Sequence, residues 1–204
     1  PTGEGTEQIV SANEIRLVYP GGAQDCEGIA IDPLTGDVIL VEKAMVAKAR
    51  IHRLPTEAWD TQDDDPRTLE LVATINFETD SLTGGLITGA DIAPSGTELF
   101  VRTYIAGFHV PITRTHDGTI NGFGAVRQVS VYDDGQCEAV AYDSTGLELW
   151  FTCEDENGPI ARADCKTSRD DETGVTTTDE GGCMAASGLW PLICGLLLVR
   201  RRKL

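Results

Sequence analysis

Residues 25–42 read DCEGIAIDPLTGDVILVE, in which a strand of small and aliphatic residues, a Pro-Leu-Thr-Gly turn and a β-branched strand follow one another. Two short strands joined by a tight turn with glycine are the signature of a β-hairpin. The unit recurs as TGADIAPSGTELFVRT at residues 88–103 and as QCEAVAYDSTGLELWFT at residues 136–152. Its turn glycines, Gly36, Gly96 and Gly146, lie 60 and 50 residues apart. This period is typical of four-stranded propeller blades of about 40–50 residues plus insertions, and it is too long for leucine-rich or ankyrin repeats.

The two remaining strands of each repeat are expected between the hairpins. They are predicted at residues 49–54 and 69–75, at 107–111 and 126–131, and, for the last repeat, at 159–163 alone. Residues 14–19 are predicted to be an outer strand of an earlier blade. We therefore expect an all-β fold for residues 1–165, a partial β-propeller of about three four-stranded antiparallel blades. Such a chain lacks its N-terminal blades, and its open sheet edges favour self-association.

These repeats resemble secreted bacterial propellers of six or seven blades, which are loosely related to phytase-like and strictosidine-synthase-like propellers. The resemblance covers residues 11–165. It rests on short motifs in all three repeats, namely Tyr19-Pro20-Gly21-Gly22, Asp32-Pro33-x-Thr35-Gly36, Val41-Glu42-Lys43, Ile51-His52-Arg53-Leu54-Pro55, Thr88–Gly96, Val101-Arg102-Thr103-Tyr104 and Cys137–Tyr142. The resemblance implies the propeller fold, but it does not define an activity, because propellers host binding, scaffolding and hydrolysis alike.

The chain is strongly acidic. It carries 16 Lys and Arg against 33 Asp and Glu, a formal charge of −17, and four of the basic residues lie in the last five positions. The part that precedes this basic end is therefore more negative than the whole chain. A surface of this charge repels phosphate backbones and attracts cations and basic partners, so no nucleic-acid partner is expected.

Acidic side chains recur at the start of the predicted innermost strands. Glu27 and Glu138 hold this place in the first and third repeats, and Thr88 or Asp91 is their counterpart in the second. Innermost strands line the central channel of a propeller, so these oxygen atoms are expected to meet near one mouth of the channel. Carboxylates in that place suit Ca²⁺, which takes six to eight oxygen ligands. We therefore predict calcium ligands at Glu27, Asp91 and Glu138.

The alternative for these glutamates is structural: each caps backbone amides or pairs with Lys43 or Arg102.

Other catalytic patterns are absent, because the three histidines lack metal-ligand spacing and no nucleophile elbow or P-loop occurs. Two functional classes follow. The first is a binding or scaffold module for an unknown extracellular ligand. The second is a metal-dependent hydrolase that acts on phosphoesters or lactones at the channel, with catalytic residues unassigned.

Four of the six cysteines fall in the predicted folded part: Cys26, Cys137, Cys153 and Cys165. An even number in an exported protein suggests disulfides, and four cysteines allow three connectivities. Around a hairpin that turns at residues 144–145, Cys137 and Cys153 stand nearly opposite and within reach of a cross-strand bond. A Cys153–Cys165 bond is the alternative.

The composition changes after the last of these cysteines. Residues 166–182 are polar, rich in Thr and acidic side chains, and without an apolar period, so they are predicted to be a disordered spacer. Residues 183–204 are predicted to be a separate sorting or anchor segment.

This last segment begins with a cysteine that follows two glycines. Gly181, Gly182 and Cys183 precede an apolar run at residues 184–199, predicted to form one hydrophobic helix, and the basic cluster at 200–203. The arrangement resembles myxobacterial C-terminal sorting tails, in which the cysteine marks the site used by a processing protease. We therefore predict an exported chain at the cell surface or the membrane, with its basic end in the cytoplasm. A membrane anchor that is never cut is the alternative.

Overall fold

The computed structural model describes residues 14–43, 48–59, 65–77, 86–131, 136–154 and 160–165. The predicted spacer, the candidate processing site at Gly181, Gly182 and Cys183, and the predicted C-terminal helix lie outside these residues. Within them the fold is all-β, as predicted, with one short 3-10 helix, η1 (Thr56–Trp59), as the exception. No helix in the described part is long and apolar enough to span a membrane.

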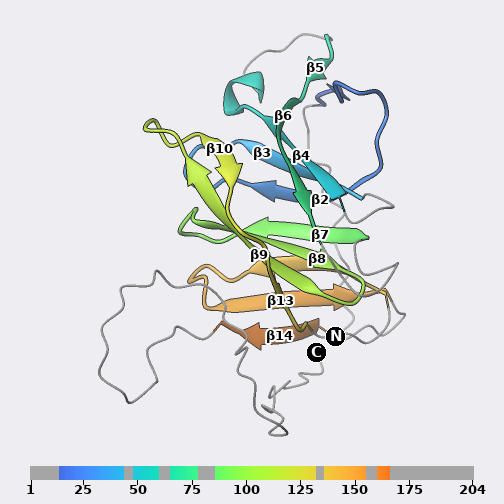
Figure 1. Ribbon diagram of the computed structural model, residues 1–204, viewed down its shortest axis with the longest axis vertical. Helices are drawn as coiled ribbons and strands as arrows, with labels where there is room; N and C mark the ends of the chain where they lie inside the picture. The colour runs from blue at the N-terminus through green and yellow to red at the C-terminus, as the bar shows by residue number, and fades with distance from the viewer. Residues whose placement is uncertain are drawn as a thin grey trace, which may run out of the picture.

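Three antiparallel sheets make up most of the structure (Figure 1). Sheet 1 contains β2 (Cys26–Ile31), β3 (Val38–Glu42), β4 (Lys48–Leu54) and β6 (Glu70–Asn76), in that order. Sheet 2 contains β7 (Ile87–Ile92), β8 (Glu98–Thr103) and β9 (Gly107–Arg114), and β9 pairs with both β10 (Ile120–Phe123) and β11 (Arg127–Val129). Sheet 3 contains β12 (Cys137–Tyr142), β13 (Glu148–Cys153) and β14 (Ile160–Asp164).

Every strand that the repeats predicted is found, and two features differ from the expectation. The strand β10 was not predicted; it forms because β9 is longer than expected and its second half needs a partner. Residues 14–19 were expected to belong to an earlier blade. Instead β1 (Leu17–Val18) runs parallel to β5 (Arg67–Thr68), with the amide of Leu69 donating to the carbonyl of Val18 at 2.9 Å.

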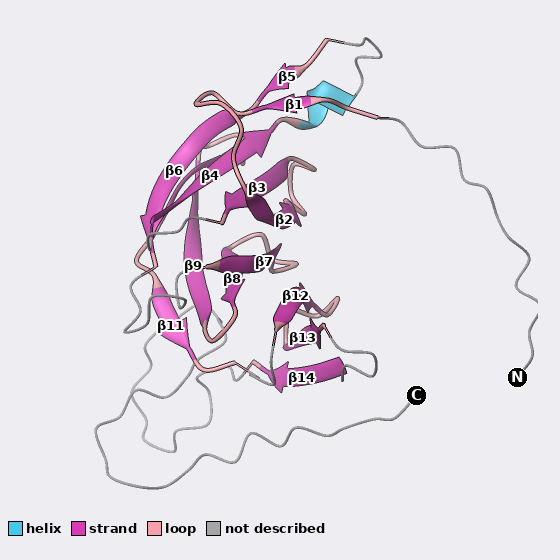
Figure 2. Cartoon of the chain, turned by 90° about the vertical axis from the view of Figure 1, so that its right-hand side faces the viewer, coloured by secondary structure: helices cyan, strands magenta, loops and turns pink. Residues whose placement is uncertain are grey.

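The sheets lie one above another, and their first strands are neighbours. Figure 2 shows β2, β7 and β12 along one side of the stack and β6 and β11 along the other. β7 contacts β2 in the sheet before it and β12 in the sheet after it. The corresponding ends of the first strands, β2, β7 and β12, are therefore close together on this side of the stack.

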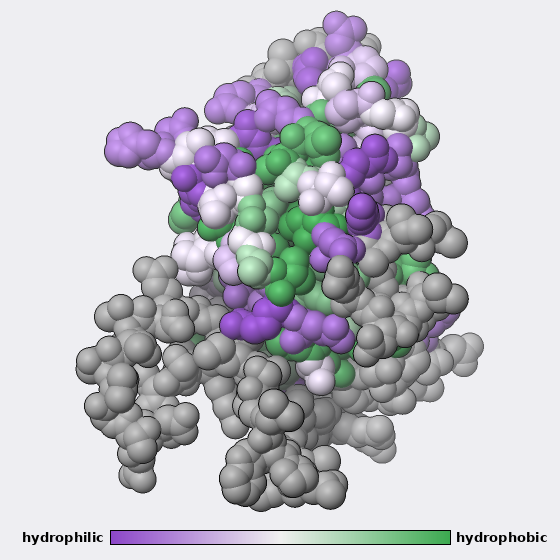
Figure 3. All heavy atoms as spheres, in the orientation of Figure 1, coloured by the Kyte–Doolittle hydropathy of each residue, from purple (hydrophilic) through white to green (hydrophobic). Residues whose placement is uncertain are grey.

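Two clusters of the core fill the spaces between the sheets, and a third, which includes Val38, Leu40, Leu54 and Leu69, lies on the outer face of sheet 1. Between sheets 1 and 2 the core includes Ile39, Val41 and Ile51 on one side and Leu99 and Val101 on the other, all with no exposed surface. A smaller cluster between sheets 2 and 3 is built around Phe100, Leu149 and Phe151. In the space-filling view, hydrophobic residues accordingly follow the centre of the stack, with polar residues around them (Figure 3). Burial of these faces drives the association of the sheets.

The first two strands of each sheet pair in the same irregular way. In sheet 1 Cys26 pairs with Glu42 and Gly28 with Val41, which leaves one residue, Glu27, bulged between them. The same bulge leaves Thr88 unpaired in sheet 2 and Glu138 in sheet 3. Equivalent residues of successive sheets are consequently 61 and then 50 positions apart.

Candidate functional site

The three bulged residues face a common pocket. A β-bulge redirects a side chain out of the regular alternation of a strand, and such bulges are frequent beside functional sites. Because the bulges occur at the same place in adjacent first strands, Glu27, Thr88 and Glu138 line one open pocket of about 400 Å³. The rest of its wall comes from Ala139, Thr152, Cys153 and Glu154. Of the two middle counterparts considered from the sequence, Thr88 and not Asp91 lines this pocket with Glu27 and Glu138.

A second set of equivalent positions joins these residues. Lys43, Tyr104 and Glu154 each follow the second strand of a sheet at the repeat spacings of 61 and 50. Lys43 Nζ donates to Glu27 Oε1 at 2.7 Å and contacts Tyr104 Oη at 3.0 Å. Tyr104 in turn donates to Glu138 Oε1 at 3.4 Å. One polar chain thus runs across all three sheets at the pocket.

Charge is unevenly compensated along this chain. Desolvation disfavours the ammonium of Lys43, but its contacts with Glu27 and Tyr104 outweigh desolvation, so its pKa is raised. The pKa of Glu138 is also raised, first by desolvation and then by a hydrogen bond and charge repulsion from Glu154, against the opposing effects of Lys43 and Tyr104. Two carboxyl groups that meet in this way retain a proton more readily than an isolated one.

Asp91 was predicted to be a calcium ligand together with Glu27 and Glu138, but it does not line the pocket. Its carboxylate accepts hydrogen bonds from the backbone amides of Tyr142 at 2.7 Å and Ile92 at 2.9 Å, and it ties sheet 2 to sheet 3. Burial raises the pKa of Asp91 in spite of these two bonds. Thr88, the other counterpart considered from the sequence, holds the equivalent position instead.

The acidic side chains are not preassembled as a metal centre. In the parts of the chain that the structure describes, no group of three or more His, Cys, Asp or Glu side chains is arranged to hold a metal ion. Glu27 forms the ion pair with Lys43 that was the structural alternative for this residue. Arg102, the other basic partner considered, donates through Nε to the carbonyl of Cys137 at 3.0 Å.

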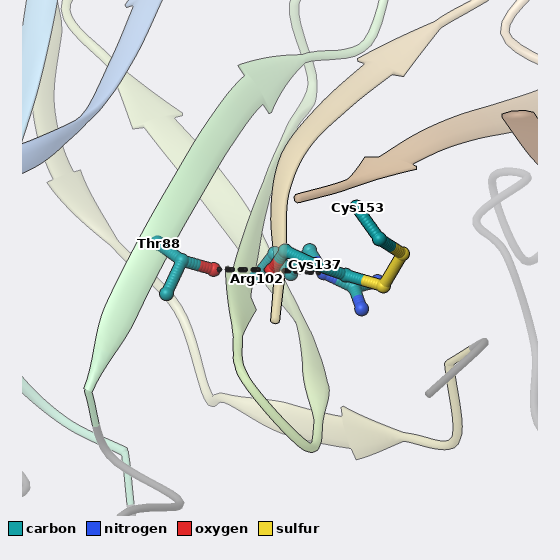
Figure 4. Close-up of a disulfide and its surroundings, with 4 residues drawn as sticks. All are labelled: Thr88, Arg102, Cys137 and Cys153. Carbon is teal, nitrogen blue, oxygen red and sulfur yellow. Dashed lines mark hydrogen bonds between the residues drawn. A yellow bond between two sulfur atoms is a disulfide. The ribbon is translucent and has the colours of Figure 1, made fainter. Parts of the chain in front are cut away.

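The pocket wall is fixed by a cross-strand disulfide. Cys137 and Cys153 are directly paired residues of β12 and β13 and form the disulfide predicted from the hairpin geometry. The alternative bond between Cys153 and Cys165 is therefore wrong. Figure 4 shows Thr88 and Arg102 converging on the carbonyl of Cys137 beside this disulfide. The backbone that carries Glu138 is thus held by a covalent bond and by two hydrogen bonds from sheet 2.

The sequence analysis missed two residues of this site, Tyr104 and Glu154. Neither is part of a recognisable catalytic or metal-binding motif. A signal was nevertheless available, because both occupy the repeat position of Lys43. A search for polar residues immediately after each second strand would have found all three.

Comparison with protein-family models finds no match for this chain, and comparison with the curated proteins finds no similar sequence. The residues of the pocket and their contacts therefore carry the functional argument.

Proposed function

We propose that this chain is an exported β-propeller that acts as a binding module and that its ligand is a cation held at the pocket of Glu27, Thr88 and Glu138. The observation that carries the proposal is the convergence of equivalent positions. Three bulges direct residues 27, 88 and 138 to one place, and three strand ends bring residues 43, 104 and 154 beside them. The sheets also pack through their first strands, as propeller blades do.

The charge of the pocket favours a cation. Glu27, Glu138 and Glu154 contribute three carboxyl groups to its lining, and Lys43 is paired with the first of them. Glu138, which accepts a hydrogen bond from Tyr104, and Glu154 offer further oxygen ligands in this pocket of about 400 Å³. Calcium is the proposed ion because it accepts carboxylate, hydroxyl and water oxygens in flexible numbers. Since the pocket is open, bound water completes its coordination.

Calorimetric titration of the full chain with CaCl₂ tests this proposal, with a diamine titrated in parallel as the organic cation. Glu138→Gln keeps the shape of the side chain and removes its charge, so we expect at least a tenfold loss of cation affinity. Asp117→Asn is the matched control, because it removes the same charge from a turn of sheet 2 remote from the pocket wall. Equal binding by the parent, Glu138→Gln and Asp117→Asn would refute a cation site at this pocket.

The affinity should also depend on pH in a defined direction. Because the pKa of Glu138 lies above its usual value, protons compete with the cation at a pH where an isolated glutamate is fully ionised. Affinity is therefore expected to be greatest near neutral pH and to fall as the pH is lowered toward this raised pKa. In Glu138→Gln this part of the pH dependence should disappear.

Export is proposed on two grounds. Disulfides persist in oxidising compartments, and Cys137–Cys153 is such a bond. Residues 181–204, with their Gly-Gly-Cys, apolar run and basic cluster, have the order of a C-terminal sorting tail. We accordingly propose surface display by a sorting protease that acts at Cys183, with the membrane as the partner of the tail and an extracellular ligand at the pocket.

A hydrolase is the second candidate, and one observation favours it. The raised pKa of Glu138 beside Glu154 is what a general acid needs, since one member of a carboxyl pair stays protonated while the other is ionised. Lys43 and Tyr104 stand on the same polar chain. Hydrolysis of a phosphate monoester or a lactone that disappears in Glu138→Gln would favour the enzyme, and cation binding without turnover favours the binding module.

A further inference from the structure

Lys43 places an ammonium group of the chain itself beside the pocket. Its Nζ donates to Glu27 Oε1 at 2.7 Å and to Tyr104 Oη at 3.0 Å, and it lies 5.1 Å from the centre of the Tyr104 ring. A carboxylate and the face of an aromatic ring are both groups that attract an ammonium ion. The Lys43 side chain is 16% exposed, so this ammonium group is held within the fold and does not extend into solvent.

The backbone repeats this arrangement in sheet 3. In sheet 1 the amide of Lys43 donates to the carbonyl of Asp25 at 2.9 Å, and in sheet 3 the amide of Glu154 donates to the carbonyl of Gln136 at 2.7 Å. Both bonds extend the pairing of the first two strands by one residue pair. Residues 43 and 154 therefore leave their sheets from equivalent places, each beside the bulged residue of its own sheet.

Sheet 3 has a second carboxyl group where sheet 1 has its ammonium group. The contact of Lys43 with Glu27 is an ion pair, whereas the equivalent contact, between Glu154 and Glu138, joins two acids. Each contact is made within a single sheet, between the bulge and the residue that follows the second strand. Two acids in contact repel each other unless a proton or another cation lies between them.

Tyr104 contacts both arrangements. Its hydroxyl accepts a hydrogen bond from Lys43 Nζ and donates one to Glu138 Oε1 at 3.4 Å. One side chain of sheet 2 thus touches the ammonium group of sheet 1 and the bulged carboxyl group of sheet 3. The contact of Lys43 with Glu27 is therefore an internal example of how this pocket holds an organic cation.

We propose that the pocket binds a primary ammonium group, such as that of a lysine side chain, between Glu138 and Glu154, in the place that Lys43 has beside Glu27. This ligand class rests on the cation site proposed above, and calcium and an ammonium group compete for the same carboxylate oxygens. A primary ammonium group has three N–H donors, enough to bond both carboxylates at once. It is charged at neutral pH, because the pKa of a lysine amine is about 10.4.

Calorimetric titration of the full chain at pH 7 with butylammonium chloride, the analogue of a lysine side chain, tests the ligand class. Nα-acetyl-lysine N-methylamide is the peptide form of the same group, and tetramethylammonium is a cation without N–H donors. We expect butylammonium to bind more tightly than tetramethylammonium by roughly tenfold or more, the size of one hydrogen bond to a charged group. CaCl₂ should raise the apparent Kd of butylammonium.

The three probes have defined outcomes. Binding of butylammonium alone supports a small amine as the source of the group, and binding of the lysine amide as well supports a peptide. Equal binding of tetramethylammonium and butylammonium would overturn the proposal, because positive charge alone would then suffice. Butylammonium binding that is independent of CaCl₂ would also overturn it, because the two cations would then use different sites.

Glu154→Lys is the most specific variant, because it reproduces in sheet 3 the acid–lysine pair of sheet 1. The introduced amine should pair with Glu138 and exclude the ligand, so we expect the affinity for butylammonium to fall roughly tenfold or more. Glu14→Lys is the matched control, since it makes the same change of charge at a side chain that is 85% exposed and does not line the pocket. It should bind butylammonium as the parent does. Equal affinity in the two variants would place the ligand elsewhere.

Two further measurements separate the possible failures. Urea denaturation shows whether Glu154→Lys is folded; if it is not, Glu154→Gln replaces it, and an unchanged butylammonium affinity in that variant would overturn the proposal. Calcium binding that Glu138→Gln weakens, without any binding of butylammonium, would overturn the ammonium ligand and leave the cation site standing. Binding of neither cation would overturn both.

Discussion

Arg114, at the end of β9, clamps the hairpin turn of sheet 1 to sheet 2. Its two terminal nitrogens donate to the carboxylate of Asp32, from Nη1 at 2.7 Å and from Nη2 at 2.9 Å. Asp32 has no exposed surface, and the Arg114 side chain is 15% exposed. The same guanidinium also donates to the carbonyls of Gly96 and Gly118. Burial opposes ionisation of Asp32, but Arg114, the amide of Leu34 and the hydroxyl of Thr35 outweigh it and lower its pKa.

Arg114→Ala should therefore destabilise the fold severely. Removing one partner of a buried ion pair costs about 3–5 kcal/mol, because the other charge stays buried without compensation. Asp32 keeps its bonds from Leu34 and Thr35, so the lower end of this range applies. A loss of about 3 kcal/mol corresponds to roughly 6–12 °C in Tm for a domain of this size. Urea denaturation at pH 7, with the unfolding free energies of parent and variant compared, measures the effect.

The control and the pH dependence make this prediction specific. Arg16→Ala breaks the pair of Arg16 with Glu14, whose side chains are 68% and 85% exposed, and should change stability by less than about 1 kcal/mol. In the parent, the lowered pKa of Asp32 contributes stability above the unfolded pKa of about 4, and this contribution is lost as the pH falls through the folded pKa. The difference between parent and Arg114→Ala should therefore shrink below pH 4. If Arg114→Ala costs no more than Arg16→Ala at pH 7, the clamp does not hold the sheets together.

Two further predictions concern the cysteines. Reduction of Cys137–Cys153, which closes a loop of 16 residues, should cost about 3 kcal/mol of stability, and denaturation with and without reductant at equal pH measures this; an unchanged midpoint would contradict it. In the native host, Cys183→Ala should abolish processing and surface retention while Cys194→Ala leaves both intact, as judged by the mass and membrane partition of the mature chain; an intact tail and equal partition in parent and both variants would identify a plain anchor.

The fold was predictable because hairpins leave strong local signals. A turn with glycine between two apolar segments identifies both strands and their pairing, so the strands of all three hairpins were located correctly. The pairing of Cys137 with Cys153 followed from the position of the same turn. The strand β10 was not predicted, because its sequence, Ile120-Asn121-Gly122-Phe123, has two turn-forming residues at its centre. It forms a strand because the second half of β9 pairs with it.

Only part of the candidate site was predictable, because the spacing between the turn glycines differs by one residue from the spacing between the equivalent strands. The turn glycines Gly36 and Gly96 are 60 positions apart, yet the strands around them are 61 apart. In the first turn the amide of Gly36 donates to the carbonyl of Asp32, four residues back, whereas Gly96 donates to Ala93, three residues back. Glycine therefore sits at different places in the two turns. An alignment on glycine places Ile87 opposite Glu27 but Thr88 opposite Glu138, so it assigns no single counterpart, and the pairing of β7 with β8 selects Thr88.

His52 and His109 both lie in the third strand of their sheets, but they are not equivalent. His52 pairs with Leu40 and His109 with Phe100, and these two partners face opposite sides of their sheets. The residue equivalent to His109 in sheet 1 is Arg53, which pairs with Ile39. His52 Nε2 instead donates to Glu42 Oε1 at 2.8 Å in a buried contact.

Once the sheets are aligned correctly, one acid–base contact recurs in all of them. Asp37 pairs with Arg53 at 3.1 Å in sheet 1, Glu98 with His109 in sheet 2, and Glu148 with Arg162 at 2.9 Å in sheet 3. Each joins the start of the second strand to the third strand, so the repeat itself accounts for the contact and no ligand is needed to explain it. The bulged positions at the pocket do not keep one type of side chain in this way, because they hold Glu27, Thr88 and Glu138.

The strand-end positions hold Lys43, Tyr104 and Glu154, three side chains of different charge, of which Glu154 lines the pocket and the other two contact its glutamates. A position that only maintains the fold of a repeat can keep one kind of side chain in every copy, as the acid–base contact does. Where equivalent positions differ while facing the same pocket, sheet geometry does not explain their identity. The repeat supplies the bulges that direct these side chains, and the choice of carboxylates at residues 138 and 154 makes the pocket acidic. We therefore expect the residues that determine function at equivalent positions where the repeats differ, and those that determine stability at positions where the repeats agree.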